Sequence, residues 1–91
     1  MNIDDYLNEE KTIYSFTDES GARSTITVEK WVGDLLQASL PDVHAWIQNQ
    51  YDRVFKKHPL ITRRQRGDVL RELAKCEAAK NPNYVPLTVF L

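Results

Sequence analysis

The sequence contains few of the residues that form cross-links, metal clusters or phosphate-binding loops. One cysteine, Cys76, occurs among 91 residues, so no disulfide can form within the chain. The two histidines, His44 and His58, lie far apart and belong to no metal-binding motif. Glycine-rich phosphate loops are also absent. We therefore expect neither enzymatic activity nor a metal or other cofactor.

Long hydrophobic runs are missing as well. No apolar stretch approaches the roughly 20 residues of a membrane span, and the first five residues, MNIDD, do not resemble a signal peptide. The composition, 42% hydrophobic and 27% charged, is typical of a globular protein. We expect a cytoplasmic protein without membrane contact, with an acidic arm over residues 1–10 and one domain over residues 11–91.

Charge of either sign is not in excess, because the formal net charge is −1, but the charges are unevenly distributed. Residues 1–20 are acidic, with Lys11 as their only cation. Residues 51–66 are basic, with Asp52 as their only anion. This asymmetry indicates either an anionic partner for the basic stretch or two solvated faces. The basic side chains are Arg53, Lys56, Lys57, Arg63, Arg64 and Arg66.

Alternating residues predict two strands, over residues 12–17 and 23–28, joined by a turn that contains Gly21. In the second strand, Ile26 and Val28 face one way, whereas Arg23, Thr25 and Thr27 face the other. The tail, residues 84–91, alternates weakly, which is compatible with a short strand or with an arm that docks on a partner.

Apolar residues three and four apart predict three helices, over residues 29–39, 42–57 and 62–81. Thr62 and Gln65 form a capping-box pattern at the start of the third helix. Its stripe contains Val69, Leu70, Leu73 and either Ala74 or Cys76. The sequence thus predicts an α+β fold: a hairpin, three helices and a possible C-terminal strand. The candidate core or dimer-interface residues are Trp31, Leu35, Trp46, Ile47, Tyr51 and Val54.

The basic run from Arg63 to Arg66 stands at the predicted N-terminus of the third helix, where cations oppose the helix dipole. One interpretation is a bound anion such as phosphate. Ion pairs between these arginines and Asp68 or Glu72 are the other interpretation, and the sequence favours neither.

A short polar strand followed by two amphipathic helices resembles the ribbon-helix-helix family of DNA-binding proteins, the MetJ/Arc group. The residues that carry the resemblance are 23–28, then Val32, Leu35 and Leu36, then Trp46, Ile47, Tyr51 and Val54. Membership would imply a homodimer whose paired strands enter the major groove of double-stranded DNA. Arg23, Thr25 and Thr27 would then contact base edges, and the six basic side chains of residues 53–66 would contact phosphates.

A second hypothesis is a small non-enzymatic module that binds another protein. Such a module would act as an inhibitor, an antitoxin-like partner or an adaptor, and it would use the acidic arm or the apolar C-terminal tail. The two hypotheses differ in the partner that they assign to the chain, DNA or protein.

Overall fold

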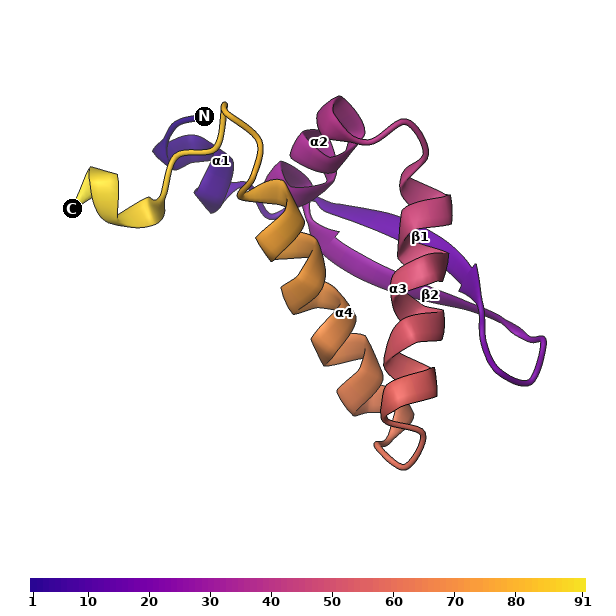
Figure 1. Ribbon diagram of the computed structural model, residues 1–91. Helices are drawn as coiled ribbons and strands as arrows, with labels where there is room; N and C mark the ends of the chain where they lie inside the picture. The colour runs from indigo at the N-terminus through magenta and orange to yellow at the C-terminus, as the bar shows by residue number, and fades with distance from the viewer.

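The computed structural model describes residues 1–91 and has the α+β architecture that the sequence predicts (Figure 1). None of its α-helices is both long and apolar enough to cross a membrane. The elements, in chain order, are α1 (Ile3–Leu7), β1 (Lys11–Thr17), β2 (Arg23–Glu29), α2 (Lys30–Ser39), α3 (Val43–Lys57), α4 (Arg63–Ala78) and the 3₁₀-helix η1 (Leu87–Phe90).

Strands β1 and β2 form a two-stranded antiparallel sheet in which Tyr14 pairs with Ile26. The turn between them uses Gly21 at φ 82°, a conformation that only glycine adopts without steric cost. The Asp18 carboxylate accepts hydrogen bonds from the main-chain N–H groups of Ser20 and Ala22 and from the Ser20 hydroxyl. These bonds fix the turn and therefore the register of the hairpin.

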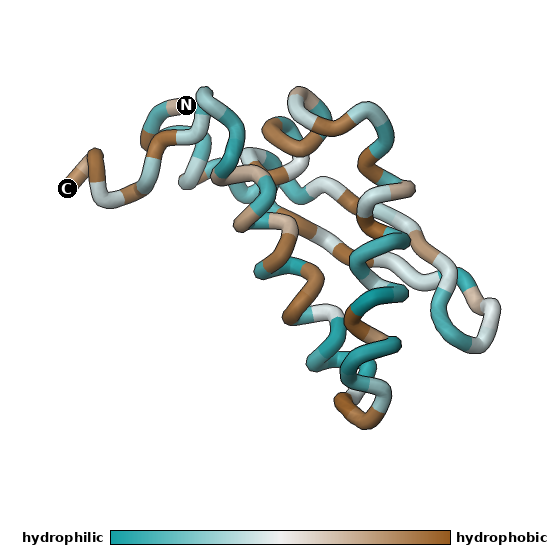
Figure 2. Tube along the Cα trace, in the orientation of Figure 1, coloured by the Kyte–Doolittle hydropathy of each residue, from teal (hydrophilic) through white to brown (hydrophobic).

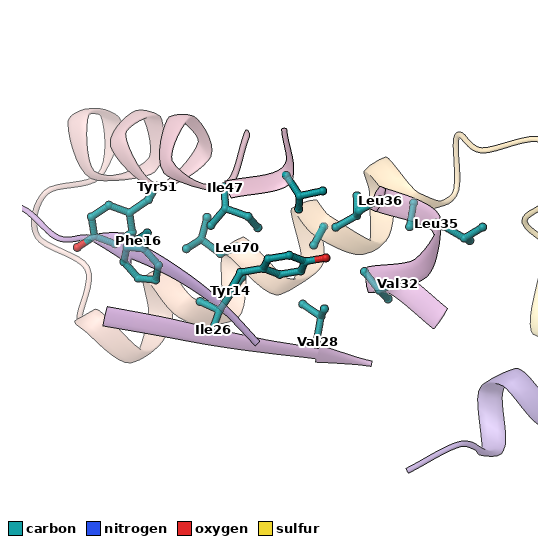
Figure 3. Packing of buried hydrophobic residues seen from close by; sticks show 13 residues of the cluster. Tyr14, Phe16, Ile26, Val28, Val32, Leu35, Leu36, Ile47, Tyr51 and Leu70 are labelled. Atoms are coloured by element: carbon teal, nitrogen blue, oxygen red, sulfur yellow. The ribbon is translucent and has the colours of Figure 1, made fainter. Parts of the chain in front are cut away.

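The core lies between one face of the hairpin and the helices α2, α3 and α4 (Figures 1 and 3). Four of the six predicted core or interface residues are buried there, and Trp31 and Trp46 are partly buried against the same cluster. The chain therefore covers this apolar stripe by itself. The four buried residues are Leu35, Ile47, Tyr51 and Val54.

Helix α2 lies very close to strand β1 because Gly33 has no side chain. A Cβ atom at Gly33 would lie 2.5 Å from Thr12 Oγ1 and 2.8 Å from Thr12 Cβ. The Tyr14 hydroxyl donates to the Gly33 carbonyl across the same contact, at 3.5 Å. A residue that weakens the helix intrinsically thus allows it to pack on the sheet.

The predicted capping box of α4 is present, formed by Thr62 and Gln65, and Asp42 caps α3 by accepting from the Ala45 N–H. The apolar stripe of α4 differs from the prediction. Its buried positions recur every four residues, so Cys76 is exposed and Ala74 takes the buried place. The two alanines among these positions let α4 approach its neighbouring helices closely. The buried positions are Arg66, Leu70, Ala74 and Ala78.

The predicted C-terminal strand is not present. The tail forms the helix η1 instead, with main-chain hydrogen bonds from Val89 to Pro86 and from Leu91 to Thr88. These local bonds satisfy the backbone without a neighbouring strand, and Pro86 itself has no N–H for a sheet. Hydrophobic residues gather in this tail and at the turn between α3 and α4 (Figure 2).

The acidic arm and the tail pack together at one end of the molecule. The Tyr6 hydroxyl of α1 donates to the Val85 carbonyl, and the Tyr6 ring lies 5.3 Å from that of Trp31 and 6.2 Å from that of Phe90. Burial in this cluster is the largest cause that raises the pKa of Tyr6, to about 12. The arm is therefore a docked helix.

Candidate functional site

Side chains of α3 cover the outer edge of strand β1 at its C-terminal end, beside Ser15 and Thr17. The Gln48 amide accepts from the Thr17 N–H at 2.7 Å and donates to the Thr17 carbonyl at 2.9 Å. The ring of His44 places Nδ1 3.5 Å from the Ser15 carbonyl. This edge of the hairpin therefore has its main-chain groups partly paired and hindered by a helix.

The outer edge of strand β2 is open. In an antiparallel pair, the main-chain groups of alternate residues point toward the partner strand and away from it. The main-chain groups of Thr17 bond to Gln48 and therefore point away from β2. Thr25 and Thr27 of β2 are in phase with Thr17 in the register, so their main-chain groups point away from β1. Neither threonine has a hydrogen bond from its N–H or its carbonyl to another element. The chain thus exposes an unpaired strand edge.

A groove of about 200 Å³ runs beside this open edge, between β2 and α4. Ser24, Thr25 and Ile26 line it on the strand side. On the helix side, Gly67 leaves space: a Cβ atom there would meet nothing nearer than the Arg71 guanidinium, at 3.7 Å. We call this feature the β2 groove. Its helix wall consists of Arg63, Arg64, Gly67 and Arg71.

The three arginines of the β2 groove differ in their partners. Arg63 pairs with Asp18 at 2.7 Å but remains 64% exposed. Arg71 pairs with Asp68 one turn earlier on the same helix. Arg64 is exposed and forms no ion pair. The groove therefore presents guanidinium donors that its own carboxylates neutralise only in part.

Arg66 serves the fold, because it is buried at the base of the hairpin turn. Its guanidinium lies 3.0 Å from the Glu19 carboxylate and above the rings of Tyr51 and Phe55, at 5.7 and 5.0 Å. The Tyr51 hydroxyl also donates to Glu19. Arg63 and Arg66 thus pair with Asp18 and Glu19, across the fold, and neither pairs with Asp68 or Glu72, the carboxylates that one of the two interpretations proposed.

These contacts lower the pKa of both turn carboxyls. The hydrogen bond from the Ser20 hydroxyl is the largest cause for Asp18, with further contributions from main-chain N–H groups and Arg63. The hydrogen bond from Tyr51 is the largest cause for Glu19, to which Arg66 also contributes. A carboxyl with a lowered pKa stabilises the fold above its ordinary pKa, and this contribution is lost as the pH falls through the pKa of the folded state.

We expect D18N to be less stable than the wild type at neutral pH and to lose less stability on acidification. The ordinary pKa of Asp18 is 3.8, so the difference between the two proteins should shrink as the pH falls below about 4. Urea unfolding at pH values from about 7 to about 2 measures it. E9Q is the control, because Glu9 forms no hydrogen bond or ion pair through its side chain. A difference that stays constant over this range would contradict the assignment.

The predicted base-contacting residues share one exposed surface. Arg23, Thr25 and Thr27 are exposed on the outer face of β2, and the Arg23 guanidinium donates to the Ser15 hydroxyl at 3.3 Å. The predicted phosphate contacts do not gather around that face. Only Arg63 and Arg64 line the groove, and Arg66 is buried. The remaining three belong to α3, which packs on the opposite face of the sheet (Figure 1): Arg53, Lys56 and Lys57.

The other surfaces lack a row of arginines beside an open strand edge, although a polar hollow of about 440 Å³ between β1 and α3 is lined by Arg23, His44 and Gln48 among others. No three His, Cys, Asp or Glu side chains come together in a way that could hold a metal ion. Beside α1, a recess of about 140 Å³ is lined by Trp31 and Leu35 and by the carboxylates of Asp5 and Asp34. The tail near it exposes Val89 and several other apolar side chains. The arm and the tail thus form one mixed surface.

Sequence reasoning missed Gly67 and Arg71 in the groove wall. A glycine inside the predicted third helix was the available signal, because such a residue lowers helix stability and calls for a packing or binding reason. Comparisons with protein-family models, curated proteins and solved structures found no match for this chain. The site therefore has to be interpreted from its own geometry.

Proposed function

We propose that this chain is a non-enzymatic module that binds an extended segment of another protein along the open edge of β2. The observation that carries the proposal is the asymmetry of the hairpin: Gln48 of α3 bonds to the edge of β1 at Thr17, whereas the edge of β2 has no such partner and faces a groove. An extended segment that adds to a sheet edge gains affinity from main-chain hydrogen bonds. We also propose that the protein is located in the cytoplasm.

The open edge has the size and chemistry that strand addition needs. Strand β2 has seven residues, and the main-chain groups of Thr25 and Thr27 are available to a partner. An unpaired edge is a template for another strand. The adjoining groove would receive the side chains of the added segment that point toward the helices, because strand side chains alternate between the two faces.

Replacing Thr27 by proline should abolish the binding of extended peptides, because proline removes the N–H of that position. T27V is the matched variant, since it keeps the N–H and removes only the hydroxyl. We would select binders of the wild-type protein from a displayed library of random peptides, and measure their affinity for each variant by fluorescence anisotropy. The expected result is loss of binding to T27P and near-normal binding to T27V.

T25P tests the same edge at a second position if T27P fails to fold, which circular dichroism would reveal. Selected peptides that bind folded T27P and T25P as well as the wild type would contradict the proposal. A library that yields no binder specific for this chain would contradict it too.

Binding of double-stranded DNA by the outer face of the hairpin is a second candidate, favoured by one observation. The side chains of Arg23, Thr25 and Thr27 are exposed in a row on a two-stranded ribbon, and the major groove of DNA admits such a ribbon. In a homodimer of the ribbon-helix-helix kind, a second copy would pair along the open edge of β2. T27V distinguishes the two candidate functions. If the Thr27 hydroxyl contacts DNA, T27V should weaken DNA binding, whereas peptide binding through the Thr27 main chain should be nearly unchanged in T27V.

A further inference from the structure

We infer that the β2 groove selects extended segments with acidic side chains at alternate positions. This inference rests on the proposed function and names the partner's chemistry. In the wall of the groove, three guanidinium groups stand beside a main-chain edge: those of Arg63, Arg64 and Arg71.

The carboxylates near the groove do not neutralise all of its positive charge. Asp18 is the one acidic residue that lines it, and its side chain is 1% exposed and already paired with Arg63. Asp68, the partner of Arg71, stands outside the lining. Arg64 has no carboxylate within ion-pair distance. A segment that enters the groove thus meets donors suited to a carboxylate or to another oxyanion.

The direction of α4 fixes the pattern of acidic positions. Arg63 pairs with Asp18 just before β2, and Lys75 lies 3.5 Å from Glu29 at the end of β2, so helix and strand run alongside each other in the same direction. The rise from Arg63 to Arg71 is about 12 Å along the helix axis. Residues four apart in a strand span about 13 Å and point to the same face.

An added strand therefore places every second side chain over the arginines of α4. The intervening side chains point to the outer face of the sheet, next to those of Thr25 and Thr27, where threonine or serine would continue the polar surface. Gly67 contributes by its missing side chain, which leaves the middle of the wall open. The chemistry thus fits an alternating acidic and small polar segment.

The test uses three labelled peptides of seven residues, the length of β2, in which threonine alternates with glutamate, with glutamine or with lysine. The glutamate peptide should bind about tenfold more tightly than the glutamine peptide at low salt, because its hydrogen bonds to arginine are charge-assisted. The lysine peptide should not bind. R64A should remove most of this preference. R53A is the control, since Arg53 is an exposed arginine of α3 outside the groove.

Equal affinity for the glutamate and glutamine peptides, or an R64A protein that keeps the preference, would overturn the inference. If, in either case, these peptides bound the wild type and failed to bind T27P, the proposed binding of extended segments along β2 would stand without the preference for acidic side chains. Duplex DNA that binds in an Arg64-dependent way, without binding of the glutamate peptide, would assign the arginines to nucleic acid and overturn the inference. Self-association that T27P abolishes, again without peptide binding, would assign the edge to a second copy and overturn both proposals.

Discussion

Replacing Leu70 by alanine is expected to lower the free energy of unfolding by about 2–5 kcal/mol. Leu70 is completely buried and is the one large apolar side chain that α4 inserts into the core, since its other buried apolar positions are Ala74 and Ala78. Its removal leaves a cavity between the sheet and the helices, among side chains such as Tyr14, Phe16 and Ile47 (Figure 3).

L60A is the matched control, because Leu60 is 96% exposed in the turn between α3 and α4. The same chemical change there should alter stability by less than about 0.5 kcal/mol. Urea unfolding followed by tryptophan fluorescence measures both variants. Similar losses in L70A and L60A would show that α4 does not pack as described, and the wall of the β2 groove would lose its support.

Replacing Gly33 by alanine is expected to destabilise the fold by about 1–3 kcal/mol, although alanine is the better helix former. The new methyl group would overlap the Oγ1 and Cβ atoms of Thr12, and Thr12 Cβ cannot move without the strand. Helix α2 would then have to shift away from β1. The loss should exceed the propensity gain of about 1 kcal/mol that alanine brings.

G67A provides the opposite case in the same chain. A Cβ atom at Gly67 has no neighbour nearer than 3.7 Å, so alanine there should stabilise the protein by about 0.5–1 kcal/mol. Thermal or urea unfolding of the two variants gives the signs directly. A stabilised G33A, or a strongly destabilised G67A, would contradict the packing of α2 or the open wall of the groove.

Local patterns in the sequence carry most of the secondary structure. The alternation around Ile26 and Val28, the Gly21 turn and the Thr62–Gln65 capping box each depend on residues close in the chain, and each is present. The tail is the exception: it alternates weakly, but a strand needs a partner edge, and a 3₁₀-helix satisfies its backbone locally.

The candidate site depends on contacts that no local pattern reveals. Arg63 and Asp18 are separated by 45 positions, so the sequence offered only the nearer carboxylates as partners. The contact of Gln48 in α3 with the edge of β1 at Thr17 also joins residues 31 positions apart. The exposure of Thr25 and Thr27 could be predicted from alternation, whereas the groove beside them required the packing of α4.

Residue-by-residue amide hydrogen exchange measures the open edge of β2 most directly. In the free protein, we predict fast exchange at Thr25 and Thr27 and slow exchange at Ile26 and Val28, whose amides point toward β1. A peptide bound by strand addition should slow the exchange of the two threonine amides. Unchanged exchange at Thr25 and Thr27 under saturation with a bound peptide would contradict the claim that this edge is the binding site.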